Sequence, residues 1–153
     1  MEPVNYKEIY EIFKKYKAIF PHIRQDYLKR MIAAGNVIFE DGVVIVYQKY
    51  KKKTRLGDYS AKAGTYMLHQ IVNANVGNGN TEKVFNNFLA KVIDDESDGI
   101  VLTVRANNGR ACKFYEQMSF EKVGTISWKS GEIPGVVYFL DVSNTPGDFG
   151  AWQ

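Results

Sequence analysis

Two glycines followed by two polar residues form the part of this 153-residue sequence that is best suited to hold a ligand. Gly77 and Gly79 lack a Cβ, so the backbone can turn sharply there and a ligand can approach its amides. Asn80 and Thr81, which follow, are residue types that cap helices. A helix that begins here would direct N–H groups and its positive dipole end at one point, which predicts an anion site. The alternative is a turn whose glycines only relieve strain.

The flanking segments predict a strand before this loop and a helix after it. The residues before the loop form a mixed apolar run, Tyr66, Met67, Leu68, Ile71 and Val72. Those after it recur at helical spacing, Val84, Phe85, Phe88, Leu89 and Val92. Beyond Gly99, residues 100–104 show almost no polar alternation, which is typical of a strand covered on both faces. Strand, helix and strand therefore predict a βαβ unit.

The residues before this unit predict two helices and a hairpin. Asn5 can cap a helix that runs to about Lys17, and a second helix is expected from Arg24 to Ala34. Residues 36–39 and 43–50 are β-rich and flank Glu40-Asp41-Gly42, which carries the Asp-Gly signature of a hairpin turn. Residues 51–64 are interpreted as a polar loop.

The C-terminal third predicts one helix and two strands. Asn107-Asn108-Gly109 precedes residues at i, i+3, i+4 and i+7 spacing, Ala111, Phe114, Tyr115 and Met118. Residues 123–128 and 136–142 are expected to be strands, and residues 143–153 an irregular tail. We find no internal repeat and no boundary, so residues 1–153 are interpreted as one domain.

Composition restricts the classes of protein to which the chain can belong. The single cysteine, Cys112, forms no internal disulfide and suits a reducing compartment. We find no signal peptide, no apolar run that could cross a bilayer and no metal-ligand spacing, and we expect a cytoplasmic protein. Residues 1–63 carry thirteen Lys or Arg against seven Asp or Glu, giving +6, whereas residues 64–153 carry seven against ten, giving −3. The basic half is the better candidate for an acidic partner.

The order of these elements resembles that of the GNAT N-acetyltransferase superfamily, whose members use acetyl-CoA. Residues 108–120, with Asn108, Ala111 and Phe114-Tyr115-Glu116, look like the family's Asn-x-x-Ala-x-x-Phe-Tyr-Glu-x-x-Gly-Phe segment. The glycine loop looks like its pyrophosphate motif, Gln/Arg-x-x-Gly-x-Gly/Ala. The resemblance implies an α/β fold with a mixed, mostly antiparallel sheet, one splayed parallel pair and helices on both faces.

The resemblance also implies where acetyl-CoA would bind. The pyrophosphate would lie on the main-chain amides of residues 77–81, and the pantetheine arm would pair with the backbone of the preceding strand. The implied cofactor residues are Leu68, Gln70, Ile71, Val72, Val76, Gly77, Asn78, Gly79, Asn80, Thr81, Asn108, Ala111 and Tyr115. Three positions depart from the family pattern, namely Val76, Thr81 and Ser119. Asn108 is also interpreted as a helix cap, and the two roles are compatible.

Acetyl transfer needs a neutral amine and a proton for the departing thiolate. Tyr115 matches the family position that supplies this proton, although its spacing alone indicates a core aromatic residue. His69 is a candidate general base, with packing on the strand as the alternative. Arg105 and Glu40 are candidate acceptor-binding residues, with solvent exposure or ion pairing (of Arg105 with Asp98 or Glu116) as the alternative. Cys112 is expected to be buried and inert.

The acceptor is the least determined part of the sequence interpretation. An amine of a small molecule or peptide is the first hypothesis. Nucleic acid is the second, through the basic residues Lys49, Lys51, Lys52, Lys53 and Arg55, which otherwise are a solvated edge strand. A non-catalytic binding module with the same fold is the third. The sequence leaves open the acceptor, the acyl chain, the general base, whether turnover is retained and whether the chain forms a homodimer.

Overall fold

The computed structural model describes residues 5–17, 20, 22–74 and 79–143. These residues form two compact units. Unit 1 comprises Met1–Gln48 with Leu68–Leu89, and unit 2 comprises Lys49–Met67 with Ala90–Gln153. The predicted irregular tail lies outside the described residues beyond Ser143, and the single-domain interpretation stays a prediction.

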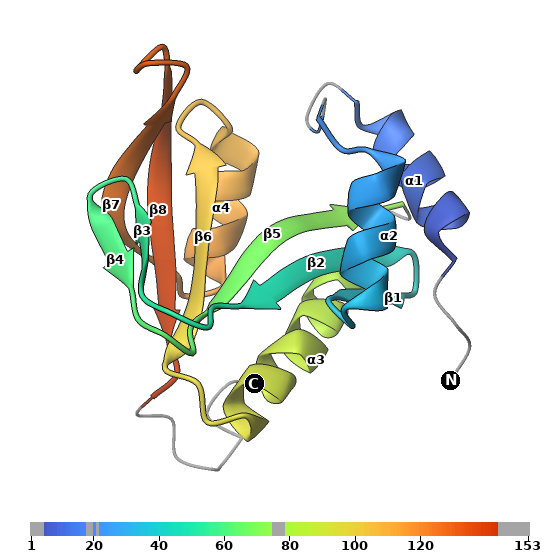
Figure 1. Cartoon of the computed structure of the whole chain (residues 1–153), viewed down its shortest axis with the longest axis horizontal. Coiled ribbons are helices and arrows are strands. Elements are labelled where there is room, and N and C mark those ends of the chain that lie inside the picture. The colour runs from blue at the N-terminus through green and yellow to red at the C-terminus, as the bar shows by residue number, and fades with distance from the viewer. Residues whose placement is uncertain (1–4, 18–19, 21, 75–78, 144–153) are drawn as a thin grey trace. The chain divides into compact units, whose positions relative to one another are not determined.

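Two helices open unit 1, α1 (Tyr6–Lys15) and α2 (Gln25–Ala33) (Figure 1). Asn5 caps α1 as predicted, because its Oδ1 accepts a hydrogen bond from the Lys7 amide at 3.0 Å. The apolar stripe of α1, Ile9, Ile12 and Phe13, is buried. Helical periodicity therefore placed both helices correctly, with ends one or two residues shorter than expected.

The predicted hairpin is confirmed as β1 (Val37–Glu40) and β2 (Val43–Lys49), paired antiparallel. Glu40 pairs with Val43, so the loop contains only Asp41 and Gly42. Both have positive φ, 50° and 79°. This left-handed pair matches the twist of the flanking strands. Glycine at the second position adopts a positive φ without steric strain.

The strands of unit 1 are covered by helices on both faces. Val44 and Val46 of β2 and Val72 of β5 (Tyr66–Asn73) share a core cluster with buried residues of α1 and α2. Tyr47, whose side chain points to the opposite face of β2, packs against Phe88 of α3 (Asn80–Asp94) with ring centroids 5.0 Å apart. The Tyr47–Phe88 contact therefore holds α3 against β2.

One sheet of six strands has the order β1-β2-β5-β6-β8-β7. Its last three strands are β6 (Gly99–Arg105), β8 (Ile133–Asp141) and β7 (Glu121–Trp128). β6 pairs in parallel with β5, through Tyr66 with Ile100 and Met67 with Val101, and antiparallel with β8. The sheet is thus mostly antiparallel with one parallel pair, as predicted, and β6 is the internal, doubly covered strand that its apolar sequence indicated.

The polar loop expected at residues 51–64 is wrong in part, because it contains a second hairpin. β3 (Thr54–Leu56) and β4 (Tyr59–Ala61) pair antiparallel around Gly57 and Asp58. Ala61 is fully buried with Met67, Val101 and Val137 in the core of unit 2. Strands of three residues are too short to show an alternating pattern. The charged residues around them therefore led to the interpretation as a polar loop.

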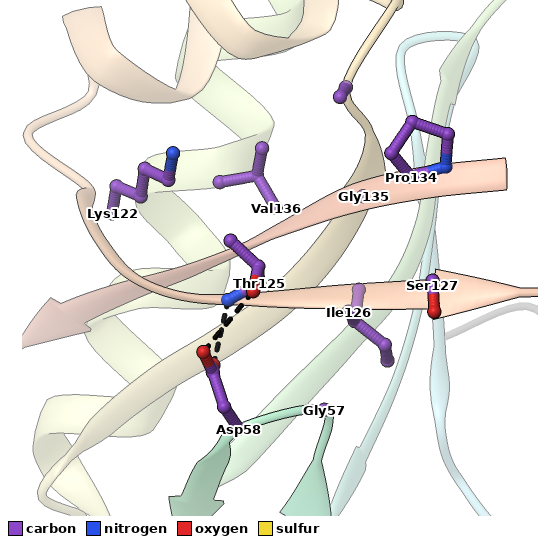
Figure 2. Close-up of a pocket in the computed structure, with 10 residues that line it drawn as sticks. Gly57, Asp58, Lys122, Thr125, Ile126, Ser127, Pro134, Gly135 and Val136 are labelled. Carbon is purple, nitrogen blue, oxygen red and sulfur yellow. Dashed lines mark hydrogen bonds between the residues drawn. The ribbon is translucent and has the colours of Figure 1, made fainter. Parts of the chain in front are cut away.

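The tip of this hairpin is bonded to β7. The Asp58 carboxylate accepts hydrogen bonds from the Thr125 amide at 2.7 Å and from its hydroxyl at 3.2 Å (Figure 2). The Asp58 amide donates to the Thr125 carbonyl at 3.1 Å. The bond from the Thr125 amide is the main cause that lowers the pKa of the Asp58 carboxyl. Asp58 therefore attaches the β3–β4 hairpin to β7.

Helix α4 (Gly109–Gln117) packs its buried Tyr115 against the rings of Phe120 and of Tyr138 on β8. Tyr138 follows Val137, which lies in the core cluster with β4, so α4 and the β3–β4 hairpin cover opposite faces of unit 2. The ring of Tyr115 therefore packs α4 against β8.

Candidate functional site

The end of β5 and the start of α3 are joined by a network of amide side chains. The Asn73 side-chain nitrogen donates to Asn80 Oδ1 and to Thr81 Oγ1, each at 2.7 Å. The Asn80 side chain is buried and donates to the carbonyl of Asp41. The Asn73 carbonyl accepts from the Tyr16 hydroxyl at 3.0 Å. The strand end, the helix start and the β1–β2 turn are therefore locked together within unit 1.

Gly79 lies directly before this helix in a backbone conformation that favours glycine. Its φ is 74°, and a Cβ added there would meet nothing within 4 Å. α3 begins at Asn80, and the N–H groups of a helix's first turn have no partner within the helix. The expected anion site thus has a helix N-terminus and an open space beside Gly79. Asn75 and three candidate residues, Val76, Gly77 and Asn78, lie outside the described residues.

The candidate residues on β5 have different surroundings. Leu68 and Val72 are buried, and Ile71 is partly buried. Gln70 accepts a hydrogen bond from the Tyr27 hydroxyl of α2 at 3.0 Å. Since Leu68 and Val72 are buried and Gln70 is bonded to Tyr27, contacts of these residues with a cofactor would come mainly from their backbone.

His69 is a half-buried residue whose ring is held by an amide. Its Nε2 lies 2.7 Å from Gln48 Oε1, and this bond makes Nε2 the donor and leaves Nδ1 as the acceptor. Burial lowers the pKa of the imidazole below its ordinary value. A neutral imidazole with an accepting Nδ1 can take up a proton. Gln48 had no signal in the sequence, because it lies 21 residues away on another strand.

Tyr115 is buried among aromatic rings, as its spacing predicted. Its ring contacts Phe114, Phe120 and Tyr138 at centroid distances of 5.4, 5.5 and 6.4 Å. Burial raises the pKa of the Tyr115 phenol, with a smaller contribution from Cys112. The phenol is therefore fully protonated at neutral pH, as a proton donor must be.

A second phenol next to Tyr115 was not predicted. The Tyr138 hydroxyl donates to Glu116 Oε2 at 2.6 Å. Burial, followed by this bond, raises the pKa of Tyr138 well above its ordinary range. The pair joins α4 to β8, and its partners are 22 residues apart, so neither residue alone indicated it.

The start of α4 confirms one interpretation and corrects another. Asn108 is the N-cap, because its Oδ1 accepts from the Ala111 amide at 3.2 Å. Cys112, expected to be buried, is only partly buried, with its Sγ 4.0 Å from the Arg105 carbonyl. The apolar stripe of α4 is narrow, and position 112 lies at its margin.

The two candidate acceptor residues are both exposed. Glu40 accepts a hydrogen bond from the Asn87 side chain of α3 at 2.9 Å. Arg105 forms no ion pair with Asp98 or Glu116, all three of which are described, so the ion-pair alternative for Arg105 is not supported.

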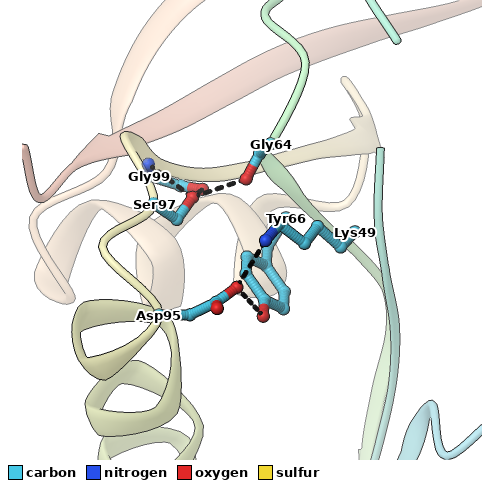
Figure 3. Close-up of polar contacts among 6 residues, drawn as sticks. All are labelled: Lys49, Gly64, Tyr66, Asp95, Ser97 and Gly99. Carbon is cyan, nitrogen blue, oxygen red and sulfur yellow. Dashed lines mark hydrogen bonds and ion pairs between the residues drawn. The ribbon is translucent and has the colours of Figure 1, made fainter. Parts of the chain in front are cut away.

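The basic residues from Lys49 to Arg55 are partly engaged within unit 2. Lys49 Nζ lies 2.7 Å from Asp95 Oδ2, which also accepts from the Tyr66 hydroxyl at 2.6 Å (Figure 3). The bond from Lys49 is the main cause that lowers the pKa of the Asp95 carboxyl. Arg55 Nε donates to the Gly57 carbonyl at 2.9 Å. Exposed lysines remain at positions 51, 52 and 53.

Other features of the described residues add no reactive centre. The pocket shown in Figure 2 has a volume of about 450 Å³ and is lined by one carboxylate, Asp58, and one cation, Lys122. Within the described ranges no group of three His, Cys, Asp or Glu residues is placed to hold a metal ion. None of the described helices is long and apolar enough to span a membrane.

Comparisons with known proteins find similarity in structure only. No family model matches the sequence, and no curated protein matches it. Ard1 from Thermoplasma volcanium matches with a TM-score of 0.71 and 13% identity over 92% of this chain and 95% of that one. NAA60 from Arabidopsis thaliana in complex with acetyl-CoA matches with a TM-score of 0.66 and 15% identity over 92% of this chain and 97% of that one. A GNAT family acetyltransferase from Listeria monocytogenes matches with a TM-score of 0.64 and 14% identity over 92% of this chain and 91% of that one.

Proposed function

We propose that this chain, whose fold is that of the GNAT N-acetyltransferases, transfers an acetyl group from acetyl-CoA to an amine by direct attack. One observation carries the proposal. In this fold, the strand β5 leads through Gly79, with its positive φ, to the N-terminus of α3, which the Asn73 network holds in place. A rigid helix N-terminus beside an open glycine is suited to bind a diphosphate.

The cofactor would be bound mainly by backbone groups. We assign the pyrophosphate to the amides from Gly77 to Thr81, and the pantetheine arm to the backbone of β5 from Leu68 to Val72. Asn108 and Ala111 are proposed to meet the arm at the start of α4. The Asn108 side chain already caps α4, but its carbonyl oxygen has a second lone pair. The complex of NAA60 with acetyl-CoA supports this choice of cofactor.

Two side chains are proposed to move protons. His69, neutral because of burial, would take a proton from the ammonium form of the acceptor. The amine nitrogen then attacks the thioester carbonyl, a C–N bond forms, and the C–S bond breaks. The departing thiolate takes the Tyr115 phenolic proton. The acylated nitrogen releases its remaining extra proton to solvent, and the Tyr115 phenolate takes a proton from solvent, which completes the cycle. Burial keeps that phenol protonated until the thiolate forms.

We propose an amine of a peptide or small molecule as the acceptor, with Arg105 and Glu40 among its contacts. Both are exposed, and Arg105 lacks an ion-pair partner among the described residues. A nucleic acid acceptor is less favoured, because Lys49 is neutralised by Asp95 and Arg55 bonds to its own turn. A cytoplasmic location and a homodimer stay predictions.

Thermal stability with and without acetyl-CoA tests the cofactor. A ligand that binds only the folded chain at about a hundred times its dissociation constant stabilises it by roughly 2.7 kcal/mol. We expect acetyl-CoA to raise the melting temperature and pantetheine, which lacks the pyrophosphate, to have much less effect. If acetyl-CoA at millimolar concentration leaves the melting temperature unchanged, the proposed function is wrong.

Replacing Tyr115 with Phe tests the chemistry. Removing a general acid lowers turnover by about a hundredfold or more, while acetyl-CoA binding should be retained. Tyr138→Phe is the matched control, since it removes a buried phenol of the same cluster and should keep turnover. Thiol release measured with a peptide amine reports the result. Binding of acetyl-CoA by the unmodified chain without any turnover would favour the non-catalytic alternative.

A further inference from the structure

A pocket of about 650 Å³ lies between α1 and α2, entirely within unit 1. Its lining comes from the second half of α1, from residues near Phe20, and from the first turns of α2. It differs from the pocket beside Asp58 in charge, since its walls carry four cations, Lys14, Lys17, Arg24 and Lys29, against one carboxylate, Asp26.

These cations belong to a basic segment of the chain. Residues 5–33 carry seven Lys or Arg against three Asp or Glu, giving +4, whereas the whole chain carries +3. Like charges held around one concave surface raise the local concentration of anions. With four cations and one carboxylate in its lining, the pocket is suited to attract an anion.

The four cations are not neutralised by the protein. Lys14 Nζ is 3.6 Å from the Glu11 carboxylate in an exposed i, i+3 pair, which contributes little. Lys29 lies over the ring of Tyr6, 4.5 Å from its centroid, and retains its charge. Lys17 and Arg24 are exposed and take part in no ion pair among the described residues. A ligand can thus meet at least two unpaired cations here.

Aromatic rings form the apolar part of the same pocket. Tyr10 and Phe20 are partly buried and line it, and Phe20 is held edge-on by the buried Phe13 at a centroid distance of 5.2 Å. A phosphate ion alone needs no such rings, whereas a planar base can stack on them. The volume also falls within the range of roughly 300–1,000 Å³ that is typical of sites for small organic ligands.

We propose that the α1–α2 pocket binds a nucleoside phosphate, with its phosphates on Lys17 and Arg24 and its base against Tyr10 or Phe20. None of the residues that line this pocket is among those that we assign to acetyl-CoA, so the two proposed sites share no residue. The pocket gives the protein a second ligand, independent of acetyl transfer.

A ¹H–¹⁵N NMR titration with ADP tests the proposal. ADP should shift the amides of residues 14–17 and 24–29, whereas binding of its diphosphate at the proposed cofactor site would shift those of residues 79–82. One spectrum therefore distinguishes the two sites. If ADP does not bind at one site, the amides of the other site still report whether it binds there. Pyrophosphate and adenosine, the two halves of the ligand, should each bind the pocket more weakly than ADP.

Matched variants show whether the pocket residues are responsible. Lys17→Gln with Arg24→Gln removes two charge-assisted contacts, and we expect the affinity for ADP at the pocket amides to fall about tenfold or more. Lys51→Gln with Lys53→Gln changes the net charge equally at another surface and should leave that affinity unchanged. Tyr10→Leu should lower the affinity for ADP but not for pyrophosphate. The remaining amide peaks report that each variant is folded.

Three results would overturn the proposal. The first is the absence of shifts at the pocket amides with millimolar ADP. The second is binding that Lys17→Gln with Arg24→Gln does not weaken. The third is an affinity for pyrophosphate or for a Glu-rich peptide equal to that for ADP, since this would indicate a general attraction of anions.

Discussion

The half-buried His69 side chain makes the stability of the fold depend on pH. Gln48 holds its Nε2 at 2.7 Å, and burial lowers the pKa of the ring. The unfolded chain has the ordinary histidine pKa of about 6.5. As the pH falls below that value, the unfolded chain binds a proton that the folded chain does not bind. The free energy of unfolding should therefore decrease as the pH falls from about 6.5 toward the lowered pKa.

Replacing His69 with Gln tests this dependence. Glutamine does not titrate, so the decrease in stability between pH 7 and pH 5 should be smaller in His69→Gln than in the unmodified chain. Urea unfolding at several pH values measures it. His22→Gln, which changes an exposed histidine, serves as the control and should keep the original slope. Identical slopes for all three proteins would mean that His69 does not titrate as we infer.

At the scale of elements, the C-terminal end of α4 carries a residue in an unfavourable conformation. Ser119 has a φ of 75° and donates its amide to the Glu116 carbonyl, while Phe120 donates to the Tyr115 carbonyl. This is the left-handed helix end at which glycine is usual, because a Cβ is strained there. It is also where the chain departs from the Gly-Phe of the family pattern. The side chain of Ser119 is exposed, so no packing offsets the strain.

Ser119→Gly should therefore stabilise the protein. We expect a gain of about 0.5–1 kcal/mol, which is the relief of strain less the extra entropy of glycine in the unfolded chain. For a chain of this size the melting temperature should rise by roughly 1–4 °C. Ser119→Ala keeps the Cβ and should change little. A loss of stability in the glycine variant would show that the serine side chain makes a favourable contact.

Most of the helices and strands could be predicted from the sequence. The helices and longer strands were predictable, because capping residues such as Asn5 and Asn108 and apolar repeats are local signals. The β3–β4 hairpin was missed, because its strands have three residues each and are stabilised by distant Thr125 and Val137.

The site was predictable to a lesser degree. Gly79 before a helix was a local signal, and the structure gives it the expected positive φ. The Asn73 network, the Gln48–His69 bond and the Glu116–Tyr138 bond join residues 7 to 57 positions apart, and only the folded chain brings them together. Cys112 was misjudged because periodicity identifies a stripe but not its width.

At the scale of the whole molecule, the chain passes between the two units inside regular elements. β5 belongs to unit 2 through Met67 and to unit 1 from Leu68, and α3 belongs to unit 1 through Leu89 and to unit 2 from Ala90. A boundary between independent domains falls in a linker, where few hydrogen bonds are interrupted. Here each crossing lies within a strand or a helix, so neither unit can unfold without breaking the backbone hydrogen bonds of an element that it shares.

We therefore expect one cooperative unfolding transition, with equal calorimetric and van't Hoff enthalpies. Val44→Ala in unit 1 and Val137→Ala in unit 2 each truncate a fully buried side chain, at a cost of about 2 kcal/mol. Each should move the entire transition downward by roughly 4–8 °C. Differential scanning calorimetry measures both quantities, and the exposed Val123→Ala is the control because its side chain is not buried. Two separate peaks, with each core variant moving only one of them, would show that the units are independent domains.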